Sequence, residues 1–230
     1  MILTPRLLKI AQMVSYTSAA DIGTDHAKLP VYLVEKNICS KVIASDVADG
    51  PVHACKKTVK HSGKSNQIDV RKGYGLKKLS KGEVDTIIIA GMGGDLISEI
   101  LKNDLEICTS SKEIILQPMT HISQLRAFLH NNGFCIADEV LVREKNKIYT
   151  IIKTTKGENQ YTTEFDYIVS PFLINKKDPL LKDFVGKLLE KYSKEYIGLK
   201  SATVVDEDLM IKTKLIINNL EKIYEAAKNY

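Results

Sequence analysis

Short apolar runs alternate with helical segments through the first two thirds of this 230-residue chain. The run from Thr86 to Ala90 contains three consecutive isoleucines, as expected of a strand that is covered on both faces. Strands that alternate with helices of about 10–15 residues form βαβ units around a parallel sheet. The alternation therefore predicts an α/β fold.

The same periodicity places the individual elements. The predicted strands cover residues 19–22, 42–45, 68–70, 86–90 and 113–116. The predicted helices cover residues 29–36, 51–61, 95–102 and 122–131, preceded by a first helix that starts at Pro5 and is capped by Thr4. Gly133 is placed to end the last of these helices. Residues 136–143 and 147–153 then predict a β-hairpin, and the polar residues 154–160 predict a loop.

The C-terminal part differs in kind. Apolar residues from Leu180 to Tyr192 and from Leu209 to Ala227 recur at helical spacing, with a break near residues 198–205. Two such helices predict an antiparallel helical hairpin. The sequence thus predicts two domains, residues 1–165 and 166–230. The hairpin is either a packing or dimer element or an arm that holds a large substrate, and the interspersed acidic residues favour packing.

Composition limits the functional classes. The net charge of +5 and the pI of about 8.8 are compatible with nucleic acid but do not require it. The four cysteines contain no C-x-x-C pair, so neither a structural zinc site nor any other metal is expected. The chain lacks an apolar run of membrane-spanning length, and its N-terminus lacks the apolar segment of a signal peptide. We expect a cytoplasmic protein that is a monomer, with a dimer as the alternative.

The segment Asp21–Ala27 predicts a nucleoside site. Gly23 follows the first predicted strand, and Asp46 ends the second strand 23 residues later. A glycine turn followed about 20 residues on by an acid that accepts from ribose hydroxyls is typical of nucleoside binding. Asp25 stands where a pyrophosphate-binding loop has its second glycine. An acid there suits an amine-bearing or cationic ligand, which favours S-adenosylmethionine over NAD.

Each acid has a second interpretation. Asp21 either receives the methionine amine or shapes the glycine turn. Asp46 either binds the ribose or caps the next helix. Asp25 and His26 follow the first strand and are predicted to point into the reaction cleft, although a lone histidine is more often structural.

Two further glycine turns follow strands. Gly91-Met92-Gly93 comes directly after the most apolar strand, where open α/β sheets bind their ligands. Gly73-Tyr74 follows the third strand, and Tyr74 is a candidate to stack on a purine. The second turn is weaker evidence for a ligand site, because it is only an isolated pair of glycines separated by one residue.

Several blocks together resemble the bacterial tRNA (adenine(22)-N1)-methyltransferase family. They are Leu3-Thr4-Pro5-Arg6-Leu7, Asp21 to Ala27 with Leu29-Pro30, Asp49-Gly50-Pro51, Ala90-Gly91-Met92-Gly93-Gly94 and Leu116-Gln117-Pro118. The resemblance runs from the N-terminus to about residue 155. It implies a Rossmann-like sheet of the class I methyltransferases, mostly parallel with a terminal hairpin, and a C-terminal helical or coiled-coil domain.

The resemblance also implies an activity, which is methyl transfer from S-adenosylmethionine to N1 of a tRNA adenine. Asp25 would then accept a hydrogen bond from the adenine amino group, and His26 would assist the base or the cofactor. Asp21, Gly23, Asp46, Gly73, Tyr74, Gly91, Met92 and Gly93 would bind the cofactor.

Three alternatives stay open at this stage. The first is a methyltransferase that acts on another RNA, a small molecule or a protein, with the same cofactor residues. The second is a non-catalytic RNA-binding protein on the same scaffold, which the set Asp21, Gly23 and Asp46 argues against. The third is an NAD-dependent oxidoreductase, which lacks its glycine fingerprint here.

Overall fold

The computed structural model describes residues 1–158, 161, 163–202 and 206–229. The chain divides into two compact units, Met1–Gln160 and Tyr161–Tyr230. The domain assignment made from the sequence, with its boundary after residue 165, stays a prediction.

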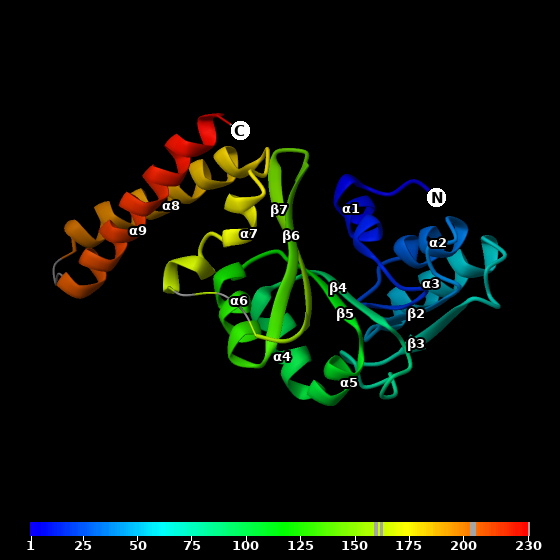
Figure 1. Ribbon diagram of the computed structural model, residues 1–230. Coiled ribbons are helices and arrows are strands. Elements are labelled where there is room, and N and C mark those ends of the chain that lie inside the picture. The colour runs from blue at the N-terminus through cyan, green and yellow to red at the C-terminus, as the bar shows by residue number, and fades with distance from the viewer. Residues whose placement is uncertain (159–160, 162, 203–205, 230) are drawn as a thin grey trace. The chain divides into compact units, whose positions relative to one another are not determined.

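The described residues of the first unit form a seven-stranded sheet with strand order β3-β2-β1-β4-β5-β7-β6 (Figure 1). Neighbouring strands from β3 to β5 are parallel, whereas β7 is antiparallel to both β5 and β6. The strands are β1 Ser18–Ile22, β2 Lys41–Asp46, β3 Ile68–Lys72, β4 Thr86–Met92, β5 Glu113–Pro118, β6 Phe134–Glu144 and β7 Lys147–Lys156. The predicted mostly parallel sheet with a terminal hairpin is confirmed.

Helices connect these strands. They are α1 Pro5–Met13, α2 Lys28–Glu35, α3 Asp49–His61, α4 Gly94–Asn103, α5 Leu105–Ser110 and α6 Ile122–Asn131. The predicted start of α1 is confirmed, because the Thr4 hydroxyl accepts from the Leu7 N–H at 3.5 Å and Pro5 is the first helical residue. Gly133 has a φ of +73° just after α6, as a helix-ending glycine requires. Helix α5 was not predicted, since its six residues are too few to show a helical period.

Helices cover both faces of the sheet. Side chains of α1, α2 and α3 form one cluster with Ile88, Ile115 and Ile151. Ile87 and Ile89 alternate with Ile88 along β4 and therefore point to the opposite face, where they too are fully buried. The apolar character of the β4 sequence follows from this two-sided burial.

The predicted loop at residues 154–160 is wrong over its first three residues, because β7 continues to Lys156. Thr154 pairs with both neighbouring strands, and its buried hydroxyl donates to the Cys135 carbonyl at 2.7 Å. Hydrogen bonds within the sheet thus satisfy polar side chains whose sequence pattern by itself suggested a loop. Residues 159–160 lie outside the described part of the chain.

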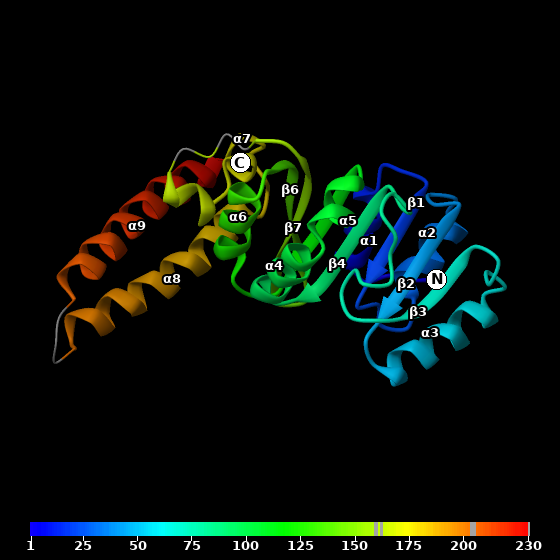
Figure 2. The same ribbon diagram turned by 90° about the horizontal axis from the view of Figure 1, so that it is seen from below.

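The second unit is helical. Its described elements are η1 Glu164–Tyr167, α7 Pro171–Asn175, α8 Leu181–Lys200, α9 Glu207–Ala226 and η2 Ala227–Asn229. Helices α8 and α9 run antiparallel side by side, which confirms the predicted hairpin (Figure 2). The break predicted from residue 198 is wrong as far as Lys200, because α8 continues through Gly198 and a single helical glycine costs only about 1 kcal/mol. Residues 203–205 of that predicted break lie outside the described residues.

Asp206 starts the second helix of this hairpin. Its carboxylate accepts from the Leu209 N–H at 2.9 Å. Neither of the two long helices, nor any other described helix, is long and apolar enough to cross a membrane.

Candidate active site

A cleft of about 330 Å³ opens beyond the carboxyl ends of β1 and β4. The strand order reverses between these two strands, since β2 lies on one side of β1 and β4 on the other. Open α/β sheets bind their ligands at such a switch point. The residues that line the cleft are Thr4, Arg6, Leu7, Asp21, Gly23, Thr24, Asp25, Lys28, Leu29, Ala90 and Gly91.

The turn after β1 is built on Gly23. The N–H groups of Gly23 and Thr24 both donate to the Ser45 carbonyl, at 2.8 and 3.1 Å, which ties the turn to the end of β2. Gly23 has a φ of +72°, and a β-carbon added to it would overlap the side-chain methyl group of Met92. The backbone conformation therefore favours glycine here, whereas the Met92 methyl group is the end of a flexible side chain that can move aside.

Asp21 is the buried acid of the cleft. Its side chain is 6% exposed and is hydrogen-bonded to Thr24. Burial raises the pKa of the Asp21 carboxyl to about 6, although the hydrogen bond from Thr24 lowers it, and the nearby charge of Asp46 adds a smaller increase. A cationic group bound beside Asp21 would compensate for the cost of ionising it there.

Asp46 ends β2, next to the Gly23 turn. One carboxylate oxygen accepts from the Ala48 N–H at 2.8 Å, so the side chain does shape the turn that leads into α3. Its backbone carbonyl accepts from the Gly73 N–H at 2.9 Å. The second carboxylate oxygen has no hydrogen-bond partner among the described residues. Both interpretations of this acid are therefore compatible, because turn formation uses a single oxygen.

Asp25 and His26 form an exposed pair at the cleft. The His26 Nε2 lies 3.3 Å from an Asp25 carboxylate oxygen, with side-chain exposures of 53% and 81%. His26 and Ala27 both have positive φ values, of 60° and 51°, so the chain turns sharply before α2. Asp25 lines the cleft, whereas His26 is not among the residues that do.

The remaining predicted residues divide between the cleft and its surroundings. The prediction that Gly91 and Met92 form a turn after the strand is wrong, because β4 continues to Met92 and Gly91 lies at an irregularity between the paired residues Ala90 and Met92. Gly91, with a φ of +81°, lines the cleft. A β-carbon on Gly93 would lie 3.2 Å from the Thr120 hydroxyl, which fits that turn against the loop after β5. The Tyr74 hydroxyl donates to a Glu99 carboxylate oxygen at 2.8 Å, and this bond raises the pKa of Tyr74. Tyr74 is thus tied to α4 and does not line the cleft.

Two residues at the site received no role from the sequence. Arg6 reaches the cleft from α1, and its Nη1 donates to the side-chain oxygen of Gln117. The same oxygen accepts from the Gly91 N–H at 3.1 Å, and the Gln117 amide nitrogen donates to the Pro118 carbonyl at 2.8 Å. Both residues belong to blocks that carried the family resemblance, which was the available signal, but neither stood in a motif of known chemistry.

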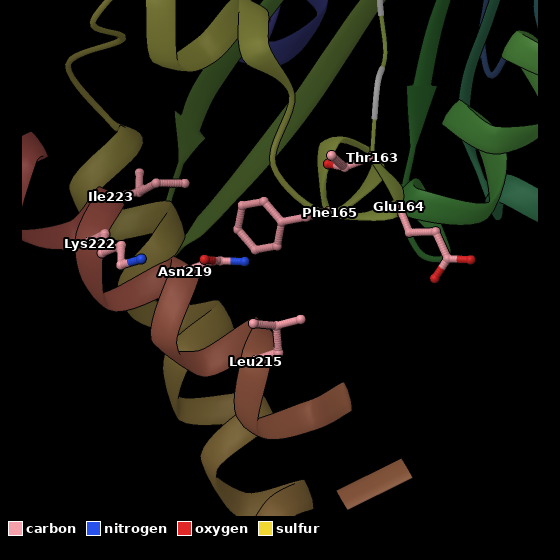
Figure 3. A pocket seen from close by; sticks show the side chains of 7 residues that line it. All are labelled: Thr163, Glu164, Phe165, Leu215, Asn219, Lys222 and Ile223. Atoms are coloured by element: carbon pink, nitrogen blue, oxygen red, sulfur yellow. The ribbon is translucent and has the colours of Figure 1, made fainter. Parts of the chain in front are cut away.

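A second pocket, of about 490 Å³, lies within the helical unit (Figure 3). Phe165 of η1 and residues of α9, among them Leu215, Asn219 and Ile223, face it. Although this pocket is larger, it contains no strand end and no glycine turn. We therefore assign the chemistry to the cleft of the first unit. The described residues contain no cluster of histidine, cysteine and acidic side chains that could hold a metal ion.

Comparison with known proteins agrees with this geometry. A family model described as tRNA (adenine(22)-N(1))-methyltransferase matches residues 19–222. A tRNA (adenine(22)-N(1))-methyltransferase from Bacillus subtilis (strain 168) is 35% identical over 230 residues, which cover 97% of this chain and 96% of that protein.

Solved structures resemble the chain over nearly its whole length. A putative tRNA (m1A22) methyltransferase from Streptococcus pneumoniae, in complex with S-adenosyl-L-methionine, has a TM-score of 0.82 and 31% identity, and the match covers 97% of this chain and 100% of that chain. TrmK from M. capricolum, in complex with S-adenosyl-homocysteine, has a TM-score of 0.79 and 26% identity over 99% of each chain.

Proposed function

This chain belongs to the tRNA (adenine(22)-N(1))-methyltransferase family, and on that premise we propose that its cleft beyond the carboxyl ends of β1 and β4 transfers a methyl group from S-adenosylmethionine to N1 of adenosine 22 in tRNA. One observation supports the assignment to this cleft. Four predicted residues line it together at the switch point of the sheet: Asp21, Gly23, Asp25 and Gly91.

The residues of the cleft fit S-adenosylmethionine. The Asp21 carboxylate is buried and suited to an amine, and the glycines at positions 23 and 91 allow close approach of a ligand to the backbone. Asp46, which ends β2 next to the Gly23 turn and keeps one carboxylate oxygen uncommitted, would accept from the ribose hydroxyls. A diphosphate would instead bring negative charge against Asp21 and Asp25, so a dinucleotide is a poor match.

The chain's own contribution to the reaction is mainly positional. S-adenosylmethionine supplies a methyl group on a positively charged sulfur. Adenine N1 has a free lone pair and needs no prior loss of a proton, so the cleft has to align the base with that methyl group. Alignment of this kind can supply roughly 7–11 kcal/mol of the barrier. Asp25 would accept a hydrogen bond from the adenine amino group, which orients the base and stabilises the positive charge that the base acquires.

His26 would act on Asp25 and not on the base. Its ring nitrogen lies 3.3 Å from the Asp25 carboxylate, outside the residues that line the cleft. In this position it limits the rotation of a highly exposed side chain. We therefore propose an orienting role for His26 in place of the predicted assistance to the base or the cofactor.

The tRNA has to present N1, which lies on the Watson–Crick edge, so the target nucleotide must leave its stack at a cost of a few kcal/mol. Acidic and basic residues balance in residues 161–230, and the net charge of +5 therefore belongs to residues 1–160. We propose that the first unit supplies most of the electrostatic attraction for the phosphate backbone of the tRNA. The protein would act on tRNA in the cytoplasm.

The test is transfer of labelled methyl groups from S-adenosylmethionine to an unmodified tRNA transcript, followed by digestion and mass identification of the nucleoside. The expected product is 1-methyladenosine in a transcript with adenosine at position 22, and none in the matched transcript with guanosine there. Methylation of both transcripts, or of another nucleoside, would contradict the proposed substrate atom or position. No transfer despite measurable cofactor binding would contradict the tRNA assignment.

A further inference from the structure

The excess positive charge of the first unit is concentrated in one short segment. Residues 50–68 contain four lysines and no aspartate or glutamate, so they carry four of the five excess positive charges of residues 1–160. The segment covers most of α3 and the turn that leads to β3. Its four lysines form the α3 surface, which consists of Lys56, Lys57, Lys60 and Lys64.

Helix α3 presents these lysines on the side that faces away from the core. Cys55 and Val59 pack in the core cluster, whereas Lys56, Lys57 and Lys60 are all exposed. Lys60 stands one turn after Lys56 and Lys57, so the three ammonium groups share one exposed face of the helix. The helix dipole accounts for a cation in the last turn, where Lys60 stands, but not for the two lysines one turn earlier.

No carboxylate among the described residues neutralises the α3 surface. None of its four lysines forms an ion pair there. Other lysines of the same unit do pair with a carboxylate, at 2.7 to 3.1 Å; they are Lys72, Lys77, Lys112 and Lys153. The α3 surface therefore differs from the rest of the unit in leaving its charge unpaired.

The acids closest to α3 in the sequence are already paired. Asp49, the first residue of α3, pairs with Lys72 at 2.7 Å, and Asp69 on β3 pairs with Arg71 at 2.8 Å. Ile68 of β3 joins the core cluster with α3, so the alternation along the strand places Asp69 on the other face of the sheet. The α3 surface is thus open to an anion from outside the protein.

This surface lies away from the cleft. Helix α3 begins three residues after Asp46, which ends β2, and finishes before the turn that returns to the start of β3 (Figure 2). At 1.5 Å per residue, Lys56 and Lys60 stand about 10 and about 16 Å along the axis from the start of the helix. An anion held here therefore belongs to a part of the ligand outside the cleft.

We propose that the α3 surface binds the phosphate backbone of the tRNA, at a docking site separate from the cleft. The inference rests on the function proposed above and assigns part of the electrostatic attraction of the first unit to one helix. Lysine suits a contact that reads no sequence, because its ammonium group is a compact charge on a flexible stem. The exposed side chains of Ser65 and Asn66, in the turn after α3, offer further hydrogen-bond donors to phosphate.

The experiment measures the binding of the full-length protein to an unmodified tRNA transcript at several salt concentrations. The glutamine variant is Lys56→Gln/Lys57→Gln/Lys60→Gln, and the arginine variant replaces the same three lysines by arginine and keeps their charge. The control variant removes three charges elsewhere in the first unit, from exposed lysines without an ion pair among the described residues: Lys78→Gln/Lys81→Gln/Lys102→Gln. Thermal unfolding and calorimetric titration with S-adenosylmethionine verify that each variant is folded and binds the cofactor.

Each lost phosphate contact reduces the slope of log affinity against log salt concentration by about 1. The glutamine variant should therefore show a slope that is smaller by about 2 to 3, and a tRNA affinity that is lower by on the order of 10-fold at moderate salt. Its KM for tRNA should rise while kcat and the affinity for S-adenosylmethionine stay unchanged. The arginine variant and the control variant should remain close to the wild type.

An unchanged salt slope and tRNA affinity in the glutamine variant would overturn the inference, in favour of an acidic protein as the partner of this surface. An equal loss in the glutamine and control variants would also overturn it, because net charge and not the α3 surface would then determine binding. A lower kcat with unchanged tRNA affinity would do the same, in favour of a structural role for α3. All three outcomes leave the proposed function intact, whereas failure of the wild type to bind tRNA would contradict the proposed function and this inference with it.

Discussion

The side-chain methyl group of Met92 occupies the place where a β-carbon on residue 23 would stand. The end of β4 therefore lies against the turn after β1 at the switch point of the sheet. Because Gly23 also has a φ of +72°, any larger residue there is strained by the backbone, whereas the end of the flexible Met92 side chain can move aside.

Gly23→Ala should lower the affinity for S-adenosylmethionine by at least about 10-fold and reduce the melting temperature, because backbone strain of this kind costs of order 1–3 kcal/mol. Gly50→Ala is the matched control, since a β-carbon on Gly50 has open space and position 50 lies within α3. That variant should keep its affinity and lose no stability. Calorimetry and thermal unfolding measure both effects. Normal affinity in Gly23→Ala would show that the cofactor does not use this turn.

Asp46→Ala should weaken S-adenosylmethionine binding by on the order of 10- to 100-fold, because it removes charged hydrogen bonds to the ribose. Asp46→Asn keeps an oxygen that can accept from the Ala48 N–H, so it separates turn formation from ligand binding. It should unfold at the wild-type temperature and still bind more weakly than the wild type. Asp49→Asn, a nearby exposed acid that pairs with Lys72, is the control that should bind normally. Equal affinities in the wild type and Asp46→Ala would remove Asp46 from the site.

Asp25→Ala should lower kcat more than it weakens the binding of S-adenosylmethionine, because this side chain faces the base in our account. Single-turnover methylation and calorimetry on the same preparation separate the two quantities. His26→Ala should give a smaller loss of kcat, since it affects the base through Asp25. A turnover equal to that of the wild type in Asp25→Ala would exclude the role proposed for this residue.

Asp21 predicts opposite effects of pH on stability and on binding. Its pKa is about 6 in the folded protein against an ordinary value of 3.8, so ionisation within this window favours the unfolded state. Its contribution to the free energy of unfolding therefore falls as the pH rises from about 4 to about 6. Asp21→Asn should match the wild-type stability near pH 4 and exceed it at pH 8 by up to about 3 kcal/mol.

Affinity should change in the other direction. An amine pairs with the ionised carboxylate, so wild-type affinity for S-adenosylmethionine should rise through pH 6 and then level off. Asp21→Asn should bind weakly and with a flatter pH profile. Stability and affinity, measured on the two proteins across pH 4–8, provide the comparison. A variant that is no more stable than the wild type at pH 8 would show that the buried charge is already compensated.

The sheet was predictable because its signals are local. A few neighbouring residues are enough to predict each of three features: the buried strand β4 from its isoleucines, the start of α1 from Thr4, and the end of α6 from the glycine that follows it. One error came where tertiary contacts decide the outcome. Thr154 is a strand residue because two neighbouring strands pair with it. Helix α8 continues through Gly198 because one helical glycine costs only about 1 kcal/mol.

The part of the candidate site that lies in the turn after β1 could be predicted from the sequence. Asp21, Gly23 and Asp25 stand in one segment, and the structure places all three at the cleft. Arg6 and Gln117 come from the first helix and the fifth strand, so their contact exists only in the folded chain. This contact could not be predicted from spacing, although both residues were present in blocks shared with the family. The predicted family is confirmed by the comparisons.

The most direct test of the account is a crystal structure of this chain with S-adenosylhomocysteine. The account predicts the nucleoside in the cleft beyond the carboxyl ends of β1 and β4, with the ribose hydroxyls within hydrogen-bond distance of the Asp46 carboxylate and the amine of the amino-acid end beside Asp21. A ligand bound elsewhere, or a ribose that does not contact Asp46, would contradict the assignment of the site.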